Sequence, residues 1–137
     1  MTIKNDIILW DDGANCLCLL SILSEQQYKY IDGLPCITFG VSYENANFKG
    51  YDTITLFDRF YNNILNEMKN TYKSLNGAFR IYDIGADTDG YIEFVMKNGI
   101  TFIKGQLGAS FSFHSLKFEF QADQTLIERL MQAIELR

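Results

Sequence analysis

The chain has 137 residues, of which 47% are hydrophobic, and it contains eleven Phe, eight Tyr, ten Gly and a single Pro. This composition excludes a disordered chain, and the length suits a single domain that spans residues 1–137 around a buried core. The net charge of −5 disfavours nucleic-acid binding, because an acidic surface repels phosphate groups.

Strands are predicted for most of the first part of the chain. The segment after residue 15 is almost continuously apolar, which is typical of a strand buried on both faces, whereas the segment after Pro35 alternates between apolar and polar residues. Asp11-Asp12-Gly13 and Asp32-Gly33 have the composition of turns. The predicted strands are Ile7–Trp10, Cys16–Leu23, Tyr28–Ile31 and Cys36–Glu44.

The hydrophobic period then lengthens to three or four residues. Apolar side chains at this spacing form one stripe, made of Phe57, Phe60, Tyr61, Ile64, Leu65, Met68, Tyr72 and Leu75. The stripe predicts a long helix over about residues 53–74, with Phe60 facing the core. Asp52, Thr53 or Thr55 is a suitable capping residue at its start, and Asn76-Gly77 is suited to end it.

Strand periodicity returns after this helix, with strands predicted over Ala78–Ile84, Tyr91–Lys97 and Ile100–Leu107. Asn98-Gly99 joins the last two strands, and its two residues suit the positive φ angles of a type I′ turn. This turn fixes the register, because it places Val95 opposite Phe102, Phe94 opposite Ile103 and Glu93 opposite Lys104.

A further strand and a helix complete the pattern. Leu116, Phe118 and Phe120 alternate with polar residues, but Phe111 and Phe113 are out of phase with them. We therefore expect a bulge near His114-Ser115. Asp123 then caps a C-terminal helix whose apolar stripe is Leu126, Ile127, Leu130, Met131 and Ile134.

Runs of strands interrupted by few helices indicate an α+β fold. We expect an antiparallel β-sheet of about five to seven strands packed against the long central helix, together with the C-terminal helix.

No residue pattern indicates catalysis, a cofactor or a metal. Cys16 and Cys18 share one face of a strand, where adjacent cysteines bridge poorly, and a zinc site usually has four ligands. The loop Asp83–Gly90 has aspartates at only part of the spacing of a calcium loop. We expect the cysteines to be buried hydrophobes and the solitary His114 to have a structural or surface role.

Acidic turns are the candidate partner-binding sites. Loops on a rigid sheet often carry binding residues, and carboxylates there would attract Lys or Arg of a basic partner. The alternative is that these residues only form turns. The candidates are Asp11, Asp12, Asp83, Asp87 and Asp89.

The C-terminal part of the chain resembles WapI-type proteins. The resemblance lies in the segments Asp89–Val95, Ile103–Leu107 and Leu116–Leu126, with a Phe-x-x-Asp-Gln junction formed by Phe120, Asp123 and Gln124. The helix that contains Phe57, Phe60 and Leu65 precedes the sheet as in the family, although it lacks the Trp residues common in relatives. Members of this family are immunity proteins of bacterial polymorphic-toxin and contact-dependent inhibition systems, which bind and neutralise a sibling toxin.

The resemblance and the acidic charge imply a non-enzymatic immunity protein that binds a basic toxin domain. The alternative is a small-ligand-binding or enzymatic domain with an aromatic pocket near His114. The longest purely apolar run, Cys16–Leu20, is far too short for a membrane span, and the first residues lack the features of a signal peptide. We therefore expect a cytoplasmic protein that does not bind membranes.

Overall fold

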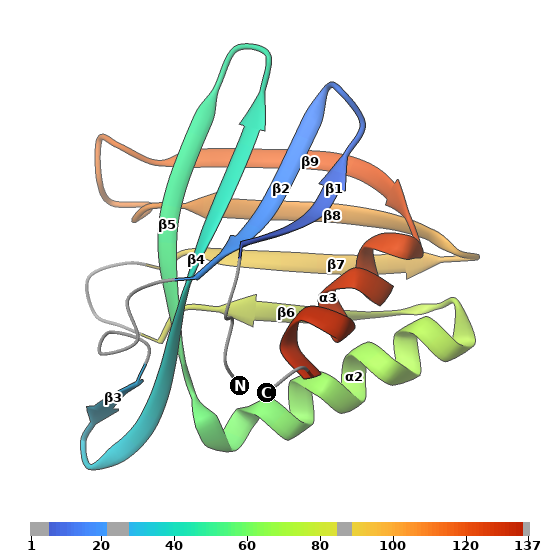
Figure 1. Ribbon diagram of the computed structural model, residues 1–137. Coiled ribbons are helices and arrows are strands. Elements are labelled where there is room, and N and C mark those ends of the chain that lie inside the picture. The colour runs from blue at the N-terminus through green and yellow to red at the C-terminus, as the bar shows by residue number, and fades with distance from the viewer. Residues whose placement is uncertain (1–5, 22–27, 85–88, 136–137) are drawn as a thin grey trace.

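The computed structural model describes residues 6–21, 28–84 and 89–135, and this part of the chain forms two antiparallel sheets and two α-helices (Figure 1). The first sheet contains β1 (Ile7–Asp11), β2 (Asn15–Leu20), β3 (Tyr28–Ile31), β4 (Leu34–Asn45) and β5 (Lys49–Phe57). The 3-10 turn η1 (Asp58–Phe60) and helix α2 (Tyr61–Ser74) follow. The second sheet contains β6 (Gly77–Tyr82), β7 (Tyr91–Lys97), β8 (Ile100–Leu107) and β9 (Leu116–Asp123), and helix α3 (Thr125–Glu135) comes after it.

Strand β4 is the centre of the first sheet. One of its edges pairs with β3 near its start and with β2 near its end, and its other edge pairs with β5. Strand β1 extends the sheet beyond β2, with a bulge between Ile8 and Trp10. Leu17 and Val41 face the core, so Cys16, Cys18 and their cross-strand neighbours lie on the opposite face of the sheet.

The second sheet is a meander in the order β6-β7-β8-β9. Asn98 and Gly99 have φ angles of 51° and 82°, and the structure confirms the three cross-strand pairs that the turn predicts. Ile92, Phe94 and Met96 are buried on one face. Each sheet is therefore built from strands that are contiguous in sequence, and α2 connects the two sheets.

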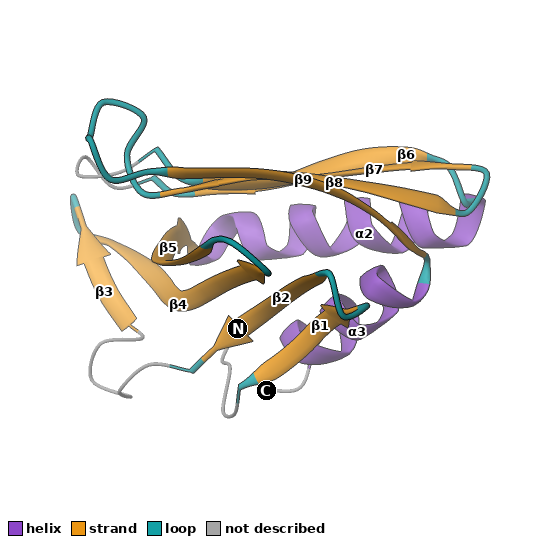
Figure 2. Cartoon of the chain, turned by 90° about the horizontal axis from the view of Figure 1, so that it is seen from above, coloured by secondary structure: helices purple, strands orange, loops and turns teal. Residues whose placement is uncertain are grey.

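The two sheets and the helices form layers. Figure 2 shows the second sheet above α2, with the first sheet and α3 beneath it, and Figure 1 shows that the strands of the two sheets run in crossing directions. The ring of Tyr43 on β4 stacks on Phe118 of β9, with 4.2 Å between ring centroids. The two helices are also joined to each other, because the Tyr61 hydroxyl on α2 donates to the Ile134 carbonyl of α3 at 2.8 Å. The core therefore lies between the sheets and is completed by the two helices.

Two close contacts need glycine. A Cβ atom on Gly105 of β8 would lie 2.3 Å from Cζ of Phe118, and one on Gly50 of β5 would lie 2.6 Å from Cδ2 of Leu116. The absence of a side chain at these positions lets Phe118 lie flat over β8 and lets the β4–β5 hairpin approach β9.

The prediction of one sheet against a long central helix is wrong in two respects. Within the described ranges, nine strands form two sheets, and residues 53–57 belong to β5 rather than to a helix. Helical structure begins only at Asp58, and α2 buries Tyr61, Met68 and Thr71, while Phe60 is half-buried. The α+β class and the antiparallel pairing are confirmed.

The segment between β8 and β9 also differs from the prediction. Residues 108–115 form a loop rather than a bulged strand, and Phe111 and Phe113 are 74% and 103% exposed. Phe111 and Phe113 are out of phase with the alternating apolar residues of β9 because they lie in this loop, outside the sheet.

The burial of strand faces differs from the prediction as well. In β2 only Leu17 and Leu19 are buried, whereas β4 is buried on both faces from Cys36 to Val41. No helix in the described part of the chain is both long enough and apolar enough to cross a membrane.

Candidate functional site

Both aspartates of the β1–β2 turn accept hydrogen bonds from residues of the same turn. Asp12 Oδ1 accepts hydrogen bonds from the backbone N–H groups of Ala14 (2.8 Å) and Asn15 (2.6 Å), and its Oδ2 accepts one from the indole of Trp10 (3.0 Å). These bonds, above all that from Asn15, lower the pKa of Asp12 to about 2. Asp11 Oδ1 accepts a bond from the Gly13 N–H at 3.0 Å. Both residues therefore shape the turn.

The aspartates around the β6–β7 loop also bind backbone groups. Asp83 Oδ1 accepts a hydrogen bond from the Thr55 N–H at 2.6 Å, which ties the end of β6 to β5. Asp89 accepts bonds from Gln106 Nε2 (2.8 Å), from the Ser110 N–H (2.7 Å) and from the Ser110 hydroxyl. The Ser110 bonds lower the pKa of Asp89. Asp87 lies outside the described residues.

The four predicted residues that the structure describes therefore fall into two separate groups. Asp83 and Asp89 lie on either side of the β6–β7 loop, next to the second sheet, whereas Asp11 and Asp12 lie in a turn of the first sheet. Asp52 was predicted only as a possible helix cap, but it lies in β5, and its Oδ2 accepts a bond from the Gly108 N–H at 2.8 Å that fixes the β8–β9 loop to β5. Its partner is distant in sequence, so no local pattern indicates this contact.

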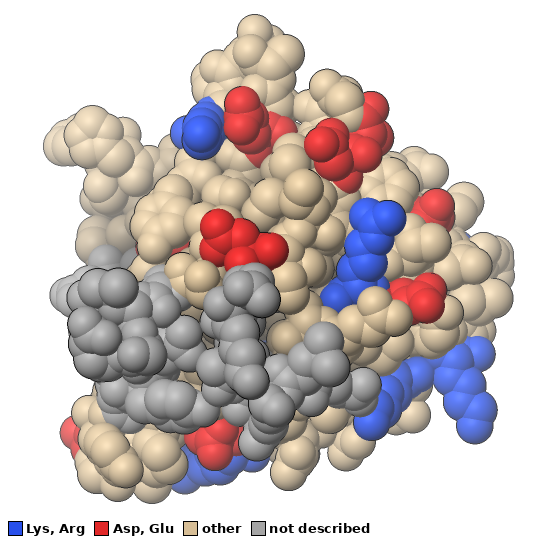
Figure 3. All heavy atoms as spheres, in the orientation of Figure 1, with Lys and Arg blue, Asp and Glu red and all other residues tan. Residues whose placement is uncertain are grey.

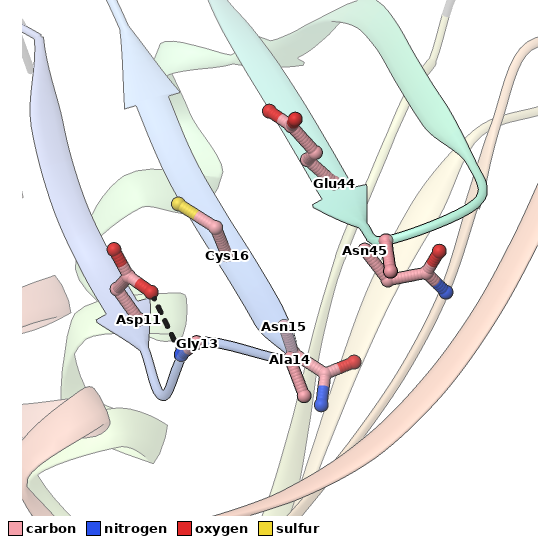
Figure 4. Close-up of a pocket in the computed structure, with 8 residues that line it drawn as sticks. Asp11, Gly13, Ala14, Asn15, Cys16, Glu44 and Asn45 are labelled. Atoms are coloured by element: carbon pink, nitrogen blue, oxygen red, sulfur yellow. Dashed lines mark hydrogen bonds between the residues drawn. The ribbon is translucent and has the colours of Figure 1, made fainter.

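A polar depression of about 300 Å³, here called the acidic notch, lies between the β1–β2 turn and the end of β4 (Figure 4). Asp11, Cys16 and Glu44 occupy adjacent positions on three neighbouring strands, and they form its wall together with Gly13, Ala14, Asn15, Asn45 and Ala46. Figure 3 shows Asp and Glu side chains gathered over the ends of the β1–β2 and β4–β5 hairpins. Glu44 was not predicted, because its place beside Cys16 depends on the pairing of β2 with β4.

Two of the three cysteines lie at this notch or next to it. The Cys16 and Cys18 sulfur atoms are 3.7 Å apart and both residues are partly exposed, whereas Cys36 is fully buried. The expectation of buried hydrophobes therefore holds only for Cys36. Burial raises the pKa of the Cys16 thiol to about 11, with smaller contributions from Cys18 and from the charges of Asp11 and Glu44.

A second depression, here called the hairpin groove, has a volume of about 350 Å³ and lies between the β4–β5 hairpin and the β8–β9 loop. Phe48 and Tyr51 form its walls on one side, and His114 lies on the other. The remaining lining residues are Lys49, Gly50, Leu107, Gly108, Ser115 and Leu116. His114 is exposed, and its backbone N–H donates to the Ser112 hydroxyl at 3.1 Å.

Large aromatic side chains are exposed on the two segments that line this groove, the β4–β5 hairpin and the β8–β9 loop. Phe48 and Tyr51 are 61% and 57% exposed, and Phe111 and Phe113 of the β8–β9 loop are exposed further still. We call these four residues the aromatic rim. Aromatic side chains are enriched in protein interfaces, because they bury a large area at low cost in conformational entropy.

Within the described ranges, no group of three or more His, Cys, Asp or Glu side chains is arranged to hold a metal ion. Comparison of the chain with models of known protein families, with curated proteins and with solved structures gave no match. The site is therefore interpreted from its own geometry.

Proposed function

We propose that this protein is a non-enzymatic immunity protein that neutralises a cognate bacterial toxin by direct binding. The observation that supports the proposal is the aromatic rim, four large rings that are exposed to solvent on the β4–β5 hairpin and the β8–β9 loop. Buried aromatic anchors supply most of the affinity of many interfaces, and surrounding charges select the partner. The resemblance to WapI-type proteins supports the same function.

The charge of the hairpin ends favours a basic toxin domain as the partner. Asp11, Asp12 and Glu44 lie at these ends, and Lys49 offsets only part of their charge. The Lys49–Glu44 ion pair is long, at 4.0 Å, and both side chains are mostly exposed, so this contact contributes little to stability and can rearrange on binding.

The proposal is tested with the toxin encoded next to this chain in its native genome. Capture of that toxin by the purified protein, and loss of its toxicity on co-expression, are the expected results. Replacing Phe48 and Tyr51 together with Ala should weaken binding by about 30-fold or more, the effect of losing about 2 kcal/mol at an interface hot spot.

Phe102→Ala is the matched control. Phe102 is a partly exposed aromatic residue, at 39%, on the outer face of the second sheet. Undiminished toxicity in the presence of the folded protein would contradict the proposed function. Equal effects of the rim and control variants would contradict only the placement of the interface.

The hairpin groove supports a second candidate, a small-ligand-binding domain. Phe48, Tyr51 and His114 line this groove, which supports the candidate, but the groove is open and His114 is exposed. A ligand screen that monitors the unfolding temperature tests this candidate. A stabilising ligand whose effect disappears in His114→Ala would favour it over the immunity function.

A further inference from the structure

The outer edge of strand β9 offers backbone groups for hydrogen bonding. In an antiparallel sheet, the N–H and C=O groups of successive residues point alternately to one neighbouring strand and to the other. The Asn98-Gly99 turn makes Lys97 and Ile100 a hydrogen-bonded pair, and this fixes the alternation through β8 and β9. Phe118 and Phe120 therefore bond to β8, whereas three residues of β9 point their backbone groups away from it: Lys117, Glu119 and Gln121. No hydrogen bond between described residues uses these outward groups.

The other edges of the described strands are protected. On β5, the outward N–H of Thr55 donates to Asp83 and its C=O accepts a bond from Ile84. A bulge interrupts β1, β3 has only four residues, and helix α2 packs along β6 (Figure 1). Bulges, short strands and covering helices are usual means of protecting an edge. Strand β9 has eight residues, no bulge and no proline, so its edge is the best suited to pair with another strand.

The ends of the β1–β2 and β4–β5 hairpins extend past this edge. The Tyr43 ring on β4 stacks on Phe118 of β9, and Figure 1 shows both hairpins continuing beyond β9. We call the parts of the two hairpins beyond Tyr43 the overhang. Asn15 and Asn45 lie in it, opposite each other and on the same face as Tyr43. A strand added to β9 would therefore have these side chains on its inner side and solvent on its outer side.

The overhang favours a single extended segment as the occupant. A second copy that paired with β9 in the antiparallel direction would bring its own overhang to the same side of the sheet, where the first copy's hairpins already lie. The hairpin groove reaches Ser115 and Leu116, where β9 begins, so a partner that contacts the aromatic rim also reaches this edge. The carboxylates of the hairpin ends favour a segment that carries Lys or Arg.

We propose that β9 binds an extended, basic segment of the toxin as an additional strand of the second sheet. The inference rests on the proposed function and states how the partner is held. Backbone hydrogen bonds to Lys117, Glu119 and Gln121 supply affinity, as in other proteins that bind a peptide at a sheet edge. Contacts of alternate side chains with the overhang supply specificity.

Amide hydrogen exchange tests the pairing on the unmutated full chain, free and bound to the toxin encoded next to it. The amides of Lys117, Glu119 and Gln121 should exchange rapidly in the free protein. In the complex they should exchange about 10-fold more slowly or less, the change expected for one new hydrogen bond each. The outward amides of Ala78 and Arg80 on β6 are the control, and their exchange should not change.

A pair of variants at position 121 separates the backbone from the side chain. Gln121→Pro removes an outward N–H but no bond to β8, and proline is tolerated at such positions of edge strands. Gln121→Ala is the matched control, because it keeps the N–H. The proline variant should bind the toxin about 10-fold more weakly than the alanine variant. Circular dichroism of both variants checks that the sheets are intact.

The possible failures are distinguishable. Toxin binding that leaves the three β9 amides unprotected, or that is equal in the two folded variants, would overturn the edge pairing and leave the proposed function intact. Absence of toxin binding would contradict both. Protection of the same amides in the free protein that grows with its concentration would identify a second copy as the occupant and would also overturn the proposal.

Discussion

At the scale of single residues, several aspartates of the turns and loops are acceptors for backbone N–H groups. Asp12, Asp52, Asp83 and Asp89 each accept at least one such bond, and three of these bonds join segments that are distant in sequence. Charged acceptors form stronger hydrogen bonds than neutral ones. Acidic residues in loops therefore fix the loops to the sheets, and their charge is only a secondary guide to partner binding.

Asp12→Ala should lower the unfolding temperature at neutral pH, because three hydrogen bonds of the β1–β2 turn are lost. The folded protein lowers the pKa of Asp12 from 3.8 to about 2. The stabilisation by its charge is therefore complete above about pH 4 and is lost as the pH falls toward 2. Thermal unfolding of both proteins across this range should show the difference between them shrinking with acidification.

Glu119→Ala serves as the control for that comparison, because Glu119 is an exposed carboxylate in the middle of β9. A difference between wild type and Asp12→Ala that is constant from neutral pH to pH 2 would refute the role of the Asp12 charge.

At the scale of elements, the contact between the two sheets depends on small residues opposite aromatic rings. Gly105 lies under the ring of Phe118, and Phe118 in turn stacks on Tyr43. The Tyr43 hydroxyl donates to Asn15 Oδ1, so one side chain joins the core to the β1–β2 hairpin. The position of this hairpin, and hence of the acidic notch, follows from this stack.

Gly105→Ala should destabilise the protein by about 1–3 kcal/mol, because its methyl group would overlap the Phe118 ring. In the Phe118→Leu background, Gly105→Ala should cost less stability than it does in the wild type, since the smaller side chain leaves room for the methyl group. Denaturant unfolding of the wild type, the two single variants and the double variant measures the coupling free energy between positions 105 and 118. Additive effects on the free energy of unfolding would show that the contact with Phe118 is not the cause of the Gly105→Ala destabilisation.

Helix α2 provides a comparison of two apolar positions. Met68 is fully buried, so Met68→Ala should cost about 2–5 kcal/mol. Phe60 is half-buried beside Phe57 and under the Arg59 guanidinium, and Phe60→Ala should cost less than Met68→Ala. The reverse order in chemical denaturation would mean that the helix presents a different face to the core.

The limits of sequence prediction follow from the same elements. The β7–β8 hairpin was predicted with its register, because two adjacent residues determine its turn. The β5 strand was missed because Phe57, Phe60 and Tyr61 continue the helical spacing backward across the strand–helix junction. The division into two sheets and the pairing that forms the acidic notch depend on contacts between distant segments, which no local pattern contains.

At the scale of the whole molecule, charge is distributed unevenly. The hairpin ends of the first sheet are acidic, whereas Arg80, Glu93, Lys104 and Glu119 alternate in sign across the four strands of the second sheet. Alternating charges on an exposed sheet face are typical of a solvated surface. The first sheet is therefore the better candidate for long-range attraction of a basic partner.

Asp11→Asn combined with Glu44→Gln should slow association with the toxin at low salt, with the effect shrinking as salt is added. Exposed charges are screened beyond about 10 Å at 0.1 M salt, so the association rate should change more than the dissociation rate. Stopped-flow kinetics measures both. Asp11→Asn keeps the Oδ1 atom that accepts the Gly13 N–H, whereas a substitution of Asp89 would disturb its bonds to both Ser110 and Gln106.

The control removes two charges elsewhere, with Glu93→Gln and Glu119→Gln on the second sheet. If both pairs slow association equally, only the net charge matters and the hairpin ends have no special role. If neither pair does so at low salt, the acidic charge serves solubility alone.

The contiguity of each sheet has a consequence for synthesis on the ribosome. Hairpins between consecutive strands close quickly, so each sheet can form soon after its own residues emerge. Helix α3 follows both sheets in the chain, yet it packs on β1 and α2, and Arg129 reaches back to the Leu9 carbonyl. A nascent chain in which α3 has not yet emerged exposes the apolar surface of β1 that α3 covers. We therefore expect the tendency to aggregate to fall once α3 has emerged and packed on β1.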